Sequence, residues 1–196
     1  MRTQHFNIFN TGTESFFTPG TQLANIAAVK PDAPAVIYVS PENKESVMTW
    51  RNRIAWYLLG QGVGPGKSVL AALPNIPTHI ALAFGIWKTG ACYVPVSNRA
   101  PQRNLMEICA CVSPALVITN RKKPDGYPGL STAELRTLCA NCPADMPPDV
   151  LAIPNLANCS GGTTGKTKVI EQDMPAGESD EGLRTWFAVS GMRFEM

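Results

Sequence analysis

The chain has 196 residues, of which 44% are hydrophobic and 16% are charged, and its formal net charge is +2. This length and composition suit one domain with a sizeable core, or one domain and part of another, and exclude a wholly disordered chain. Arg121-Lys122-Lys123 is the one basic run that stands out, so the charge pattern gives no sign of a nucleic-acid-binding surface.

The N-terminal sequence and the cysteines indicate the cellular compartment of the protein. Residues 1–17 are polar and interrupted, without the continuous apolar core of a signal peptide, and no apolar run approaches the roughly 18 residues of a membrane span. We therefore predict a soluble, cytoplasmic protein whose six cysteines are reduced thiols. Cys139 and Cys142 have the spacing of half a zinc knuckle, but no second well-spaced pair completes it, so no metal site is predicted.

Short apolar runs alternate with segments of helical periodicity between residues 35 and 120. Strands are expected at residues 35–39, 68–73, 92–96 and 115–120. Helices are expected to begin near Thr49 and Thr78, whose hydroxyls can cap them, and a third helix is expected after Pro101. Strands that alternate with helices of this length predict an α/β fold, a parallel sheet with helices on both faces.

Each predicted helix has an apolar face that would pack on this sheet. The residues on these faces are Ile54, Ala55, Leu58 and Leu59 in the first helix, Ile80, Ala81, Phe84 and Trp87 in the second, and Leu105, Ile108 and Cys109 in the third. Residues 121–154 are rich in proline and, apart from one short helix at 131–141, are expected to form a connecting region on the surface. The predicted divisions are therefore 1–120, an N-terminal α/β subdomain, 121–154, the connecting region, and 155–196, a phosphate-loop segment that begins an incomplete further subdomain.

A glycine-rich segment, "SGGTTGKTK", spans Ser160 to Lys168 and has the chemistry of a phosphate-binding loop. Its glycines let the backbone approach an anion closely, so that successive N–H groups can converge on it. The hydroxyls of Ser160, Thr163, Thr164 and Thr167 can donate to phosphate oxygens, and Lys166 and Lys168 supply positive charge. The alternative interpretation is a solvated glycine and threonine linker that carries two lysines.

Two kinds of phosphate loop fit this segment. It matches the Walker pattern G-x-x-x-x-G-K-[ST] everywhere except at Ser160, which stands in place of glycine. A Walker loop runs straight into a helix, whereas Val169 and Ile170 are β-branched and Pro175 follows, which favours a short strand. The residues therefore favour a loop between two strands over a Walker-type nucleotide hydrolase.

A longer stretch, residues 48–101, resembles the AMP-forming adenylating superfamily, the acyl-CoA synthetases and their relatives. Four motifs of that superfamily occur in order: a "T-[YW]" helix start at Thr49, a "G-V-x-P-G" turn at Gly62, "L-P-N" at Leu73 and "K-x-G-A-x-x-V-P" at Lys88. Within the superfamily, "IWKTGACYVPVSNRAP" and the doubled glycine of "SGGTTGK" resemble the bile-acid and carnitine types of CoA ligase most closely. The resemblance covers about residues 20 to 170.

The resemblance implies an ATP-dependent acid–thiol ligase. A carboxylic acid would be joined to AMP with Mg²⁺ and then transferred to coenzyme A, and no nucleic acid or membrane span is expected. The residues that would bind the ATP phosphates are Ser160, Gly161, Gly162, Thr163, Thr164, Gly165 and Lys168. Thr167 departs from the pattern, because the superfamily usually has proline there and the turn before Lys168 is less constrained without it.

Several parts that the superfamily uses have no counterpart in the 28 residues after Lys168 in this chain of 196. These parts are the later acyl-pocket motif, the adenine-binding segment, the ribose-binding aspartate and the C-terminal lid with its lysine. We therefore expect an N-terminal portion of such a ligase that is inactive alone, with its catalytic residues unknown. A non-catalytic remnant or interaction module built on the same half-domain is the alternative.

Overall fold

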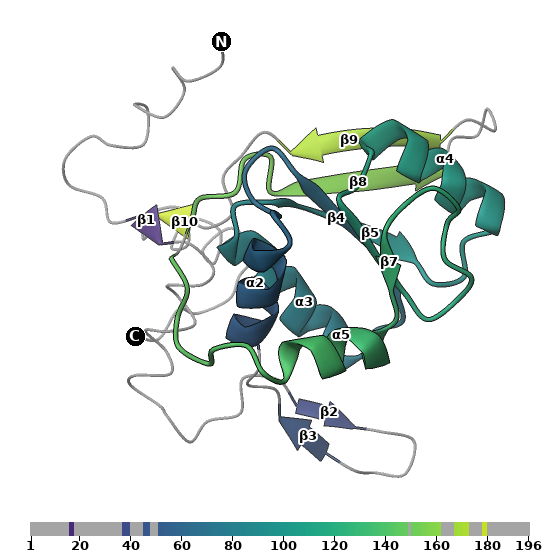
Figure 1. Ribbon diagram of the computed structural model, residues 1–196. Helices are drawn as coiled ribbons and strands as arrows, with labels where there is room; N and C mark the ends of the chain where they lie inside the picture. The colour runs from purple at the N-terminus through teal and green to yellow at the C-terminus, as the bar shows by residue number, and fades with distance from the viewer. Residues whose placement is uncertain are drawn as a thin grey trace, which may run out of the picture.

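A six-stranded sheet organises the middle of the chain (Figure 1). The structure, a computed structural model, describes residues 51–148, 150–161 and 167–172, and outside them the short strands β1 (Phe16–Phe17), β2 (Ile37–Val39), β3 (Glu45–Val47) and β10 (Glu178–Ser179). The sheet contains β4 (Ser68–Leu73), β5 (Cys92–Ser97), β6 (Leu116–Thr119), β7 (Gly129–Leu130), β8 (Leu156–Gly161) and β9 (Thr167–Gln172). Their order is β7-β6-β4-β5-β8-β9.

Five of these strands are parallel and one edge strand is antiparallel. β4 pairs in parallel with both β5 and β6, β7 and β8 extend the parallel part on either side, and β9 runs antiparallel to β8. Parallel neighbours need a crossover between them, which α3 (Pro77–Lys88) and α4 (Gln102–Val112) supply at the ends of β4 and β5. The predicted α/β fold with a parallel sheet is confirmed.

Helices cover both faces of this sheet and create two cores. α3 lies on one face with α2 (Arg51–Gly60) and α5 (Thr132–Cys139), whose buried side chains join those of Val69 and Ala71 from β4. α4 lies on the other face, where Leu105, Ile108 and Cys109 are buried as predicted against Leu70 of β4. Successive side chains of β4 thus enter opposite cores, as the two-residue period of a strand requires.

The first predicted strand does not join the parallel sheet. β2 pairs antiparallel with β3 in a separate two-stranded sheet, with Ile37 opposite Val47. Antiparallel partners can be joined by a short turn, whereas parallel ones need a long crossover. The prediction that this strand belongs to the parallel sheet was therefore wrong for the described residues 37–39.

The start of α3 also differs from the prediction. The helix begins at Pro77, its N-cap is Ile76, and no side chain caps it, so Thr78 is not the capping residue. Proline at the first helical position fixes φ in the helical range and lacks the N–H that would otherwise have no partner. The predicted cap of the preceding helix, Thr49, lies outside the described residues. Of the predicted inward face of α3, Ala81 is buried but Ile80 is 43% exposed.

Residues 121–154 contribute to the core, which corrects the expectation of a surface connection. α5 buries Leu135 and Cys139 against the cluster on the α2 and α3 face, and β7 adds an edge strand. A capping box begins α5: the Ser131 hydroxyl accepts from the Glu134 N–H, and the Glu134 carboxylate accepts from the Ser131 N–H. The segment is thus an integral part of the α/β layer, despite its prolines.

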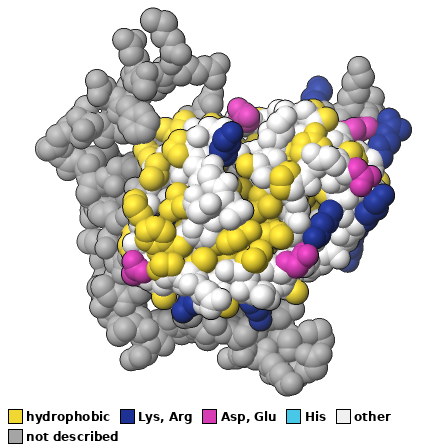
Figure 2. All heavy atoms as spheres, viewed as in Figure 1, with side chains coloured by type: hydrophobic (Ala, Val, Ile, Leu, Met, Phe, Trp, Pro, Cys, Tyr) yellow, Lys and Arg dark blue, Asp and Glu magenta, His cyan; other side chains and the backbone are white. Residues whose placement is uncertain are grey.

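The surface over these helices remains partly apolar. Figure 2 shows hydrophobic side chains across the middle of the face that carries α2, α3 and α5, with charged side chains mostly around them. Leu138 of α5, for example, is 45% exposed. Among the described residues, no helix combines the length and the apolar character that crossing a membrane requires.

The close crossing of α2 and α3 depends on Gly85. A Cβ at this position would lie 2.7 Å from Ile54 Cγ2 and 3.3 Å from the Arg51 carbonyl oxygen. Overpacking of this kind costs about 1–3 kcal/mol, which is larger than the helix propensity that alanine gains. We expect Gly85→Ala to lower the free energy of unfolding by about 1–2 kcal/mol in urea denaturation.

Gly60→Ala is the matched control, because nothing lies within 4 Å of a Cβ there. Its stability should equal or slightly exceed that of the wild type. A Gly85→Ala protein as stable as Gly60→Ala would show that the helices separate freely at this crossing.

Candidate phosphate-binding site

The glycine-rich segment connects two antiparallel strands at one edge of the sheet. β8 and β9 pair from Leu156 opposite Gln172 to Gly161 opposite Thr167, and Ser160 lies opposite Lys168. Residues 162–166, between the two strands, lie outside the described residues. We call β8, β9 and their connection the phosphate hairpin.

This arrangement distinguishes the two kinds of phosphate loop. A Walker loop leads directly into a helix, whereas β9 starts at Thr167 and continues as a strand to Gln172. The predicted position of the segment between two strands is therefore confirmed.

The predicted phosphate-binding residues fall in three places. Ser160 and Gly161 end β8, and Lys168 is the second residue of β9, with an exposed side chain. Gly162, Thr163, Thr164 and Gly165 belong to the connection that lies outside the described residues, as does Lys166. The backbone pairing brings Ser160 opposite Lys168, and the phosphate-binding role of the whole set stays a prediction.

The hairpin connection lies at the carboxyl edge of the parallel strands. β8 runs parallel to β5, so Gly161 at the end of β8 is on the same edge as Ser97 at the end of β5. Ligands of open α/β sheets generally bind outside the carboxyl ends of the strands. The location therefore suits a ligand site, and Lys168 brings positive charge to it.

One face of the hairpin is buried and the other is open. Cys159 of β8 and Val169 of β9 pack against the core on the α4 side. On the opposite face Asn158 and its partner Ile170 are exposed, Ile170 by 62%. The hairpin is thus held to the sheet from one side, while its other side remains accessible.

A carbonyl just before β8 joins the hairpin to α3 and β5. The backbone oxygen of Asn155 accepts from the indole N–H of Trp87 at 2.8 Å and from the backbone N–H of Tyr93 at 3.0 Å. Sequence reasoning placed Trp87 on an apolar face and gave Asn155 no role. Nothing in the periodicity of α3 indicates that an indole N–H reaches a residue 68 positions further along the chain.

His79 also has a partner that the sequence did not indicate. Its Nε2 contacts the Tyr93 hydroxyl, and its Nδ1 lies 3.2 Å from the Pro74 carbonyl oxygen. Burial lowers the pKa of His79, which favours the neutral ring. His79 and Tyr93, with Phe84 and Trp87, line an apolar cavity of about 700 Å³ beside the start of α3.

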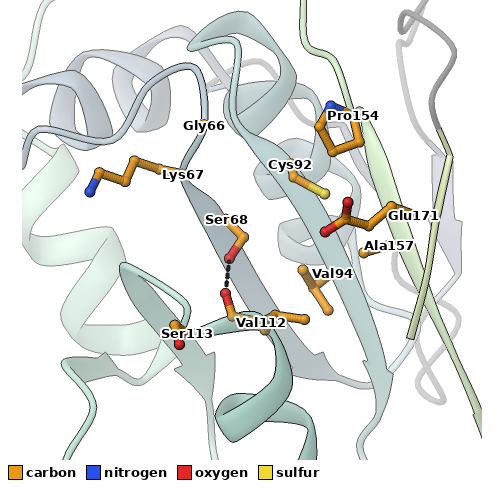
Figure 3. Close-up of a pocket in the computed structure, with 10 residues that line it drawn as sticks. All are labelled: Gly66, Lys67, Ser68, Cys92, Val94, Val112, Ser113, Pro154, Ala157 and Glu171. Atoms are coloured by element: carbon orange, nitrogen blue, oxygen red, sulfur yellow. Dashed lines mark hydrogen bonds between the residues drawn. The ribbon is translucent and has the colours of Figure 1, made fainter. Parts of the chain in front are cut away.

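A second cavity of about 380 Å³ lies near the amino ends of β4 and β5, at the edge of the sheet opposite the hairpin connection (Figure 3). In Figure 3 the Cys92 thiol and the Glu171 carboxylate point toward each other, and the Ser68 hydroxyl donates to the Val112 carbonyl at 3.3 Å. Burial, and then the negative charge of Glu171, raise the pKa of Cys92 to about 12. This thiol is therefore a poor nucleophile at neutral pH.

Metal ligands are sparse in the described part of the chain. There, no group of three or more histidine, cysteine, aspartate or glutamate side chains could hold a metal ion, and all six cysteines are free thiols. Cys139, the last residue of α5, is buried in the core on the α2 and α3 face of the sheet.

The raised pKa of Cys92 predicts slow alkylation. At pH 8 a thiol of pKa about 12 is ionised in only about one molecule in 10⁴. We expect iodoacetamide to label the exposed Cys111 at least about 100-fold faster than Cys92, as followed by peptide mass spectrometry.

Glu171→Gln removes the negative charge beside Cys92, so the pKa of the Cys92 thiol should fall and its labelling should become modestly faster. Equal labelling rates for Cys92 and Cys111 in the folded wild type would contradict the burial of this thiol.

Known proteins match this chain in sequence and in fold. Pyochelin synthetase PchE of Pseudomonas aeruginosa is 33% identical over 150 residues, which cover 74% of this chain and 10% of PchE. The dimodular nonribosomal peptide synthase of Bacillus subtilis is 32% identical over 108 residues, which cover 55% of this chain and 4% of the synthase. The chain thus spans a tenth or less of the length of these two relatives.

A solved structure has the same fold as the described sheet and helices. The N-terminal domain of FACL13 from Mycobacterium tuberculosis, in an inhibitor-bound crystal structure, matches with a TM-score of 0.69 and 22% identity, over 81% of this chain and 44% of that domain. The fold is therefore the N-terminal part of the adenylating-enzyme fold. The likeness to bile-acid and carnitine CoA ligases stays a prediction.

The family described as AMP-binding enzyme matches residues 23–174, which include the parallel sheet, the turn at the end of α3 and both strands of the phosphate hairpin. This match covers more than half of the chain, and the motifs at Thr49, Gly62, Leu73 and Lys88 all fall within it. The chain belongs to the AMP-binding enzyme family.

Proposed function

We propose that this chain is the N-terminal part of an ATP-dependent acid–thiol ligase, in which the phosphate hairpin holds the terminal phosphates of ATP. The observation that carries the proposal is the strand–connection–strand arrangement at the carboxyl edge of the sheet, with Ser160 opposite Lys168. Membership in the AMP-binding enzyme family supports it.

The reaction would begin with adenylation of a carboxylic acid. A carboxylate oxygen attacks the α-phosphorus of ATP, the bond from that phosphorus to the bridging oxygen breaks, and pyrophosphate leaves. The hydroxyls of Ser160, Thr163 and Thr164, with the backbone N–H groups of the glycines, would donate to the β- and γ-phosphates. Lys168 would neutralise charge as it accumulates on the leaving group. Such groups act by positioning and by electrostatic stabilisation.

Magnesium would arrive with the nucleotide. Lys168 of β9 is exposed, and its positive charge suits a triphosphate anion. Mg²⁺ bound to the phosphates would supply further charge neutralisation during pyrophosphate departure.

The second half-reaction would transfer the acyl group to a thiol. The thiol sulfur attacks the acyl carbon of the adenylate, AMP leaves, and a thioester forms. Coenzyme A is the acceptor implied by the resemblance to acyl-CoA synthetases. A thiol on a carrier protein is the second candidate, which the similarity to a nonribosomal peptide synthase favours.

Nucleotide binding tests the role of the hairpin. In a titration of ¹⁵N-labelled protein with MgATP, we expect chemical-shift changes in the amides of residues 160–168. We expect a Kd in the millimolar range, which corresponds to a binding free energy of about −4 kcal/mol. The affinity is low because ordering a glycine-rich segment costs about 1–2 kcal/mol per residue. Pyrophosphate should shift the same amides, whereas AMP, which lacks the β- and γ-phosphates, should not.

Lys168→Ala should weaken MgATP binding roughly five-fold, the effect of one charged contact near solvent. Lys67→Ala is the matched control, because Lys67 is also exposed but lies at the opposite edge of the sheet, and it should bind as the wild type does. Shifts confined to other parts of the protein, or equal loss in both variants, would refute the proposed site.

Turnover is expected to need more than residues 1–196. Alignment of the reacting groups can account for about 7–11 kcal/mol of a barrier, and a phosphate loop alone does not align a carboxylate. We expect no carboxylate-dependent ATP–pyrophosphate exchange with a panel of bile acids, carnitine and fatty acids. Robust exchange that disappears in Lys168→Ala would show instead that this chain assembles a complete adenylation site.

A further inference from the structure

We propose that Trp87 is a positioning residue for the phosphate hairpin. Its indole N–H holds the backbone oxygen of Asn155, the residue immediately before β8, and so fixes where the first strand of the hairpin enters the sheet. The effect on phosphate binding rests on the proposed function, whereas the effect on the placement of β8 does not.

The pairing of β8 with the rest of the sheet is short. β4 and β5 pair at six positions, from Ser68 opposite Cys92 to Leu73 opposite Ser97, whereas β5 and β8 pair at one, Tyr93 opposite Leu156. Beyond Leu156 the backbone partner of β8 is β9, which belongs to the same hairpin. Contacts at residues 155 and 156 therefore attach the hairpin at its base, while Ala157, Cys159 and Val169 pack the rest of it against the α4 side of the sheet.

The Asn155 carbonyl makes two of these contacts. It lies in a residue that is only 7% exposed, and it accepts both the Trp87 indole N–H at 2.8 Å and the Tyr93 backbone N–H at 3.0 Å. Loss of the Trp87 N–H removes one of the two hydrogen bonds to this carbonyl and leaves the bond from Tyr93 in place. The two donors come from α3 and β5, so the carbonyl joins the helix, the central sheet and the hairpin at one point.

The indole ring is itself held in place. Phe84 meets it edge to face at a centroid distance of 5.5 Å, and Tyr93 does the same at 5.9 Å. The Tyr93 hydroxyl in turn contacts His79. A ring packed between two aromatic neighbours keeps one orientation, so its N–H points steadily at Asn155.

An independent contact holds the segment that leads to Asn155. The Val150 N–H donates to the Lys88 carbonyl at 3.3 Å, and Val150 forms a parallel bridge with Thr89. Gly90, in the left-handed region with φ 78°, leaves room for this approach: a Cβ there would lie 2.7 Å from Val150 Cγ1. The turn Trp87–Gly90 thus guides the chain from Val150 to Asn155 and then into β8.

The chain contains a matched control for Trp87. The Trp56 indole N–H donates to the Asp145 carbonyl at 3.1 Å, so it makes the same kind of bond from α2 to a connecting segment, but its acceptor does not adjoin β8. Phenylalanine at either position keeps an aromatic ring and removes the N–H.

Hydrogen exchange tests the placement of β8 in the full chain of 196 residues. In Trp87→Phe we expect amides of residues 156–161 and 167–172 to exchange about five-fold faster, the effect of one lost hydrogen bond, while amides of β4 and α4 keep their wild-type rates. Trp56→Phe should leave the hairpin amides unchanged. Val150→Ala keeps the backbone bond to Lys88 but removes the side-chain methyl groups that lie against Gly90. It should raise exchange in the same hairpin amides, and it replaces Trp87→Phe as the test if that variant does not fold.

Phosphate affinity tests the functional consequence. The Kd for magnesium pyrophosphate should rise about three-fold in Trp87→Phe and stay unchanged in Trp56→Phe, because a hairpin that is docked for a smaller fraction of the time binds more weakly. A purely structural role would lower the melting temperature without changing this Kd.

Two results would overturn the proposal. One is a rate of amide hydrogen exchange in the hairpin equal to that of the wild type in both Trp87→Phe and Val150→Ala, and the other is a Kd equal to that of the wild type in a folded Trp87→Phe. Absence of pyrophosphate binding by the wild type would count against the proposed function, and the exchange rates would still decide the role of Trp87.

Discussion

The rest of the structure depends on β4, which is paired on both edges and buried on both faces. Its backbone bonds to β5 and β6 fix the register of the parallel sheet, and its side chains alternate between the two cores. Val69 and Ala71 meet α2 and α3 on one face, and Leu70 meets α4 on the other. Because parallel strands require crossovers, this single strand determines which helices cover each face and where the carboxyl edge of the sheet lies.

The phosphate hairpin is attached at the margin of this arrangement. β8 runs parallel to β5 and pairs with it at Leu156, and β9 runs antiparallel to β8, so the sheet changes from parallel to antiparallel between the two strands of the hairpin. The hairpin strands are thus attached to the parallel layer on one face and are open on the other. The Asn155 carbonyl, held by Trp87 and Tyr93, is where the rigid part meets the hairpin.

Local patterns in the sequence predict much of this fold, and long-range contacts account for the differences. The apolar runs of β4 and β6 and the inward face of α4 follow directly from periodicity, and Val169 with Ile170 indicate a strand after the glycines. The strand predicted at residues 35–39 is present at 37–39, but the alternation of apolar residues does not indicate which sheet a strand joins. Prolines made residues 121–154 look like a surface connection, although Leu135 and Cys139 reach the core. The Trp87 bond to Asn155 joins residues 68 positions apart, and no local pattern encodes it.

We propose that the phosphate hairpin is the anion site of this member of the AMP-binding enzyme family. A crystal structure of this chain with magnesium pyrophosphate tests it most directly, because it shows both the ligand and the residues between β8 and β9. We predict the pyrophosphate within the connection, between Ser160 and Lys168, with β9 still a strand and Asn155 still bound to Trp87. Pyrophosphate bound elsewhere on the sheet, or a helix that begins at Thr167 around the ligand, would contradict the account.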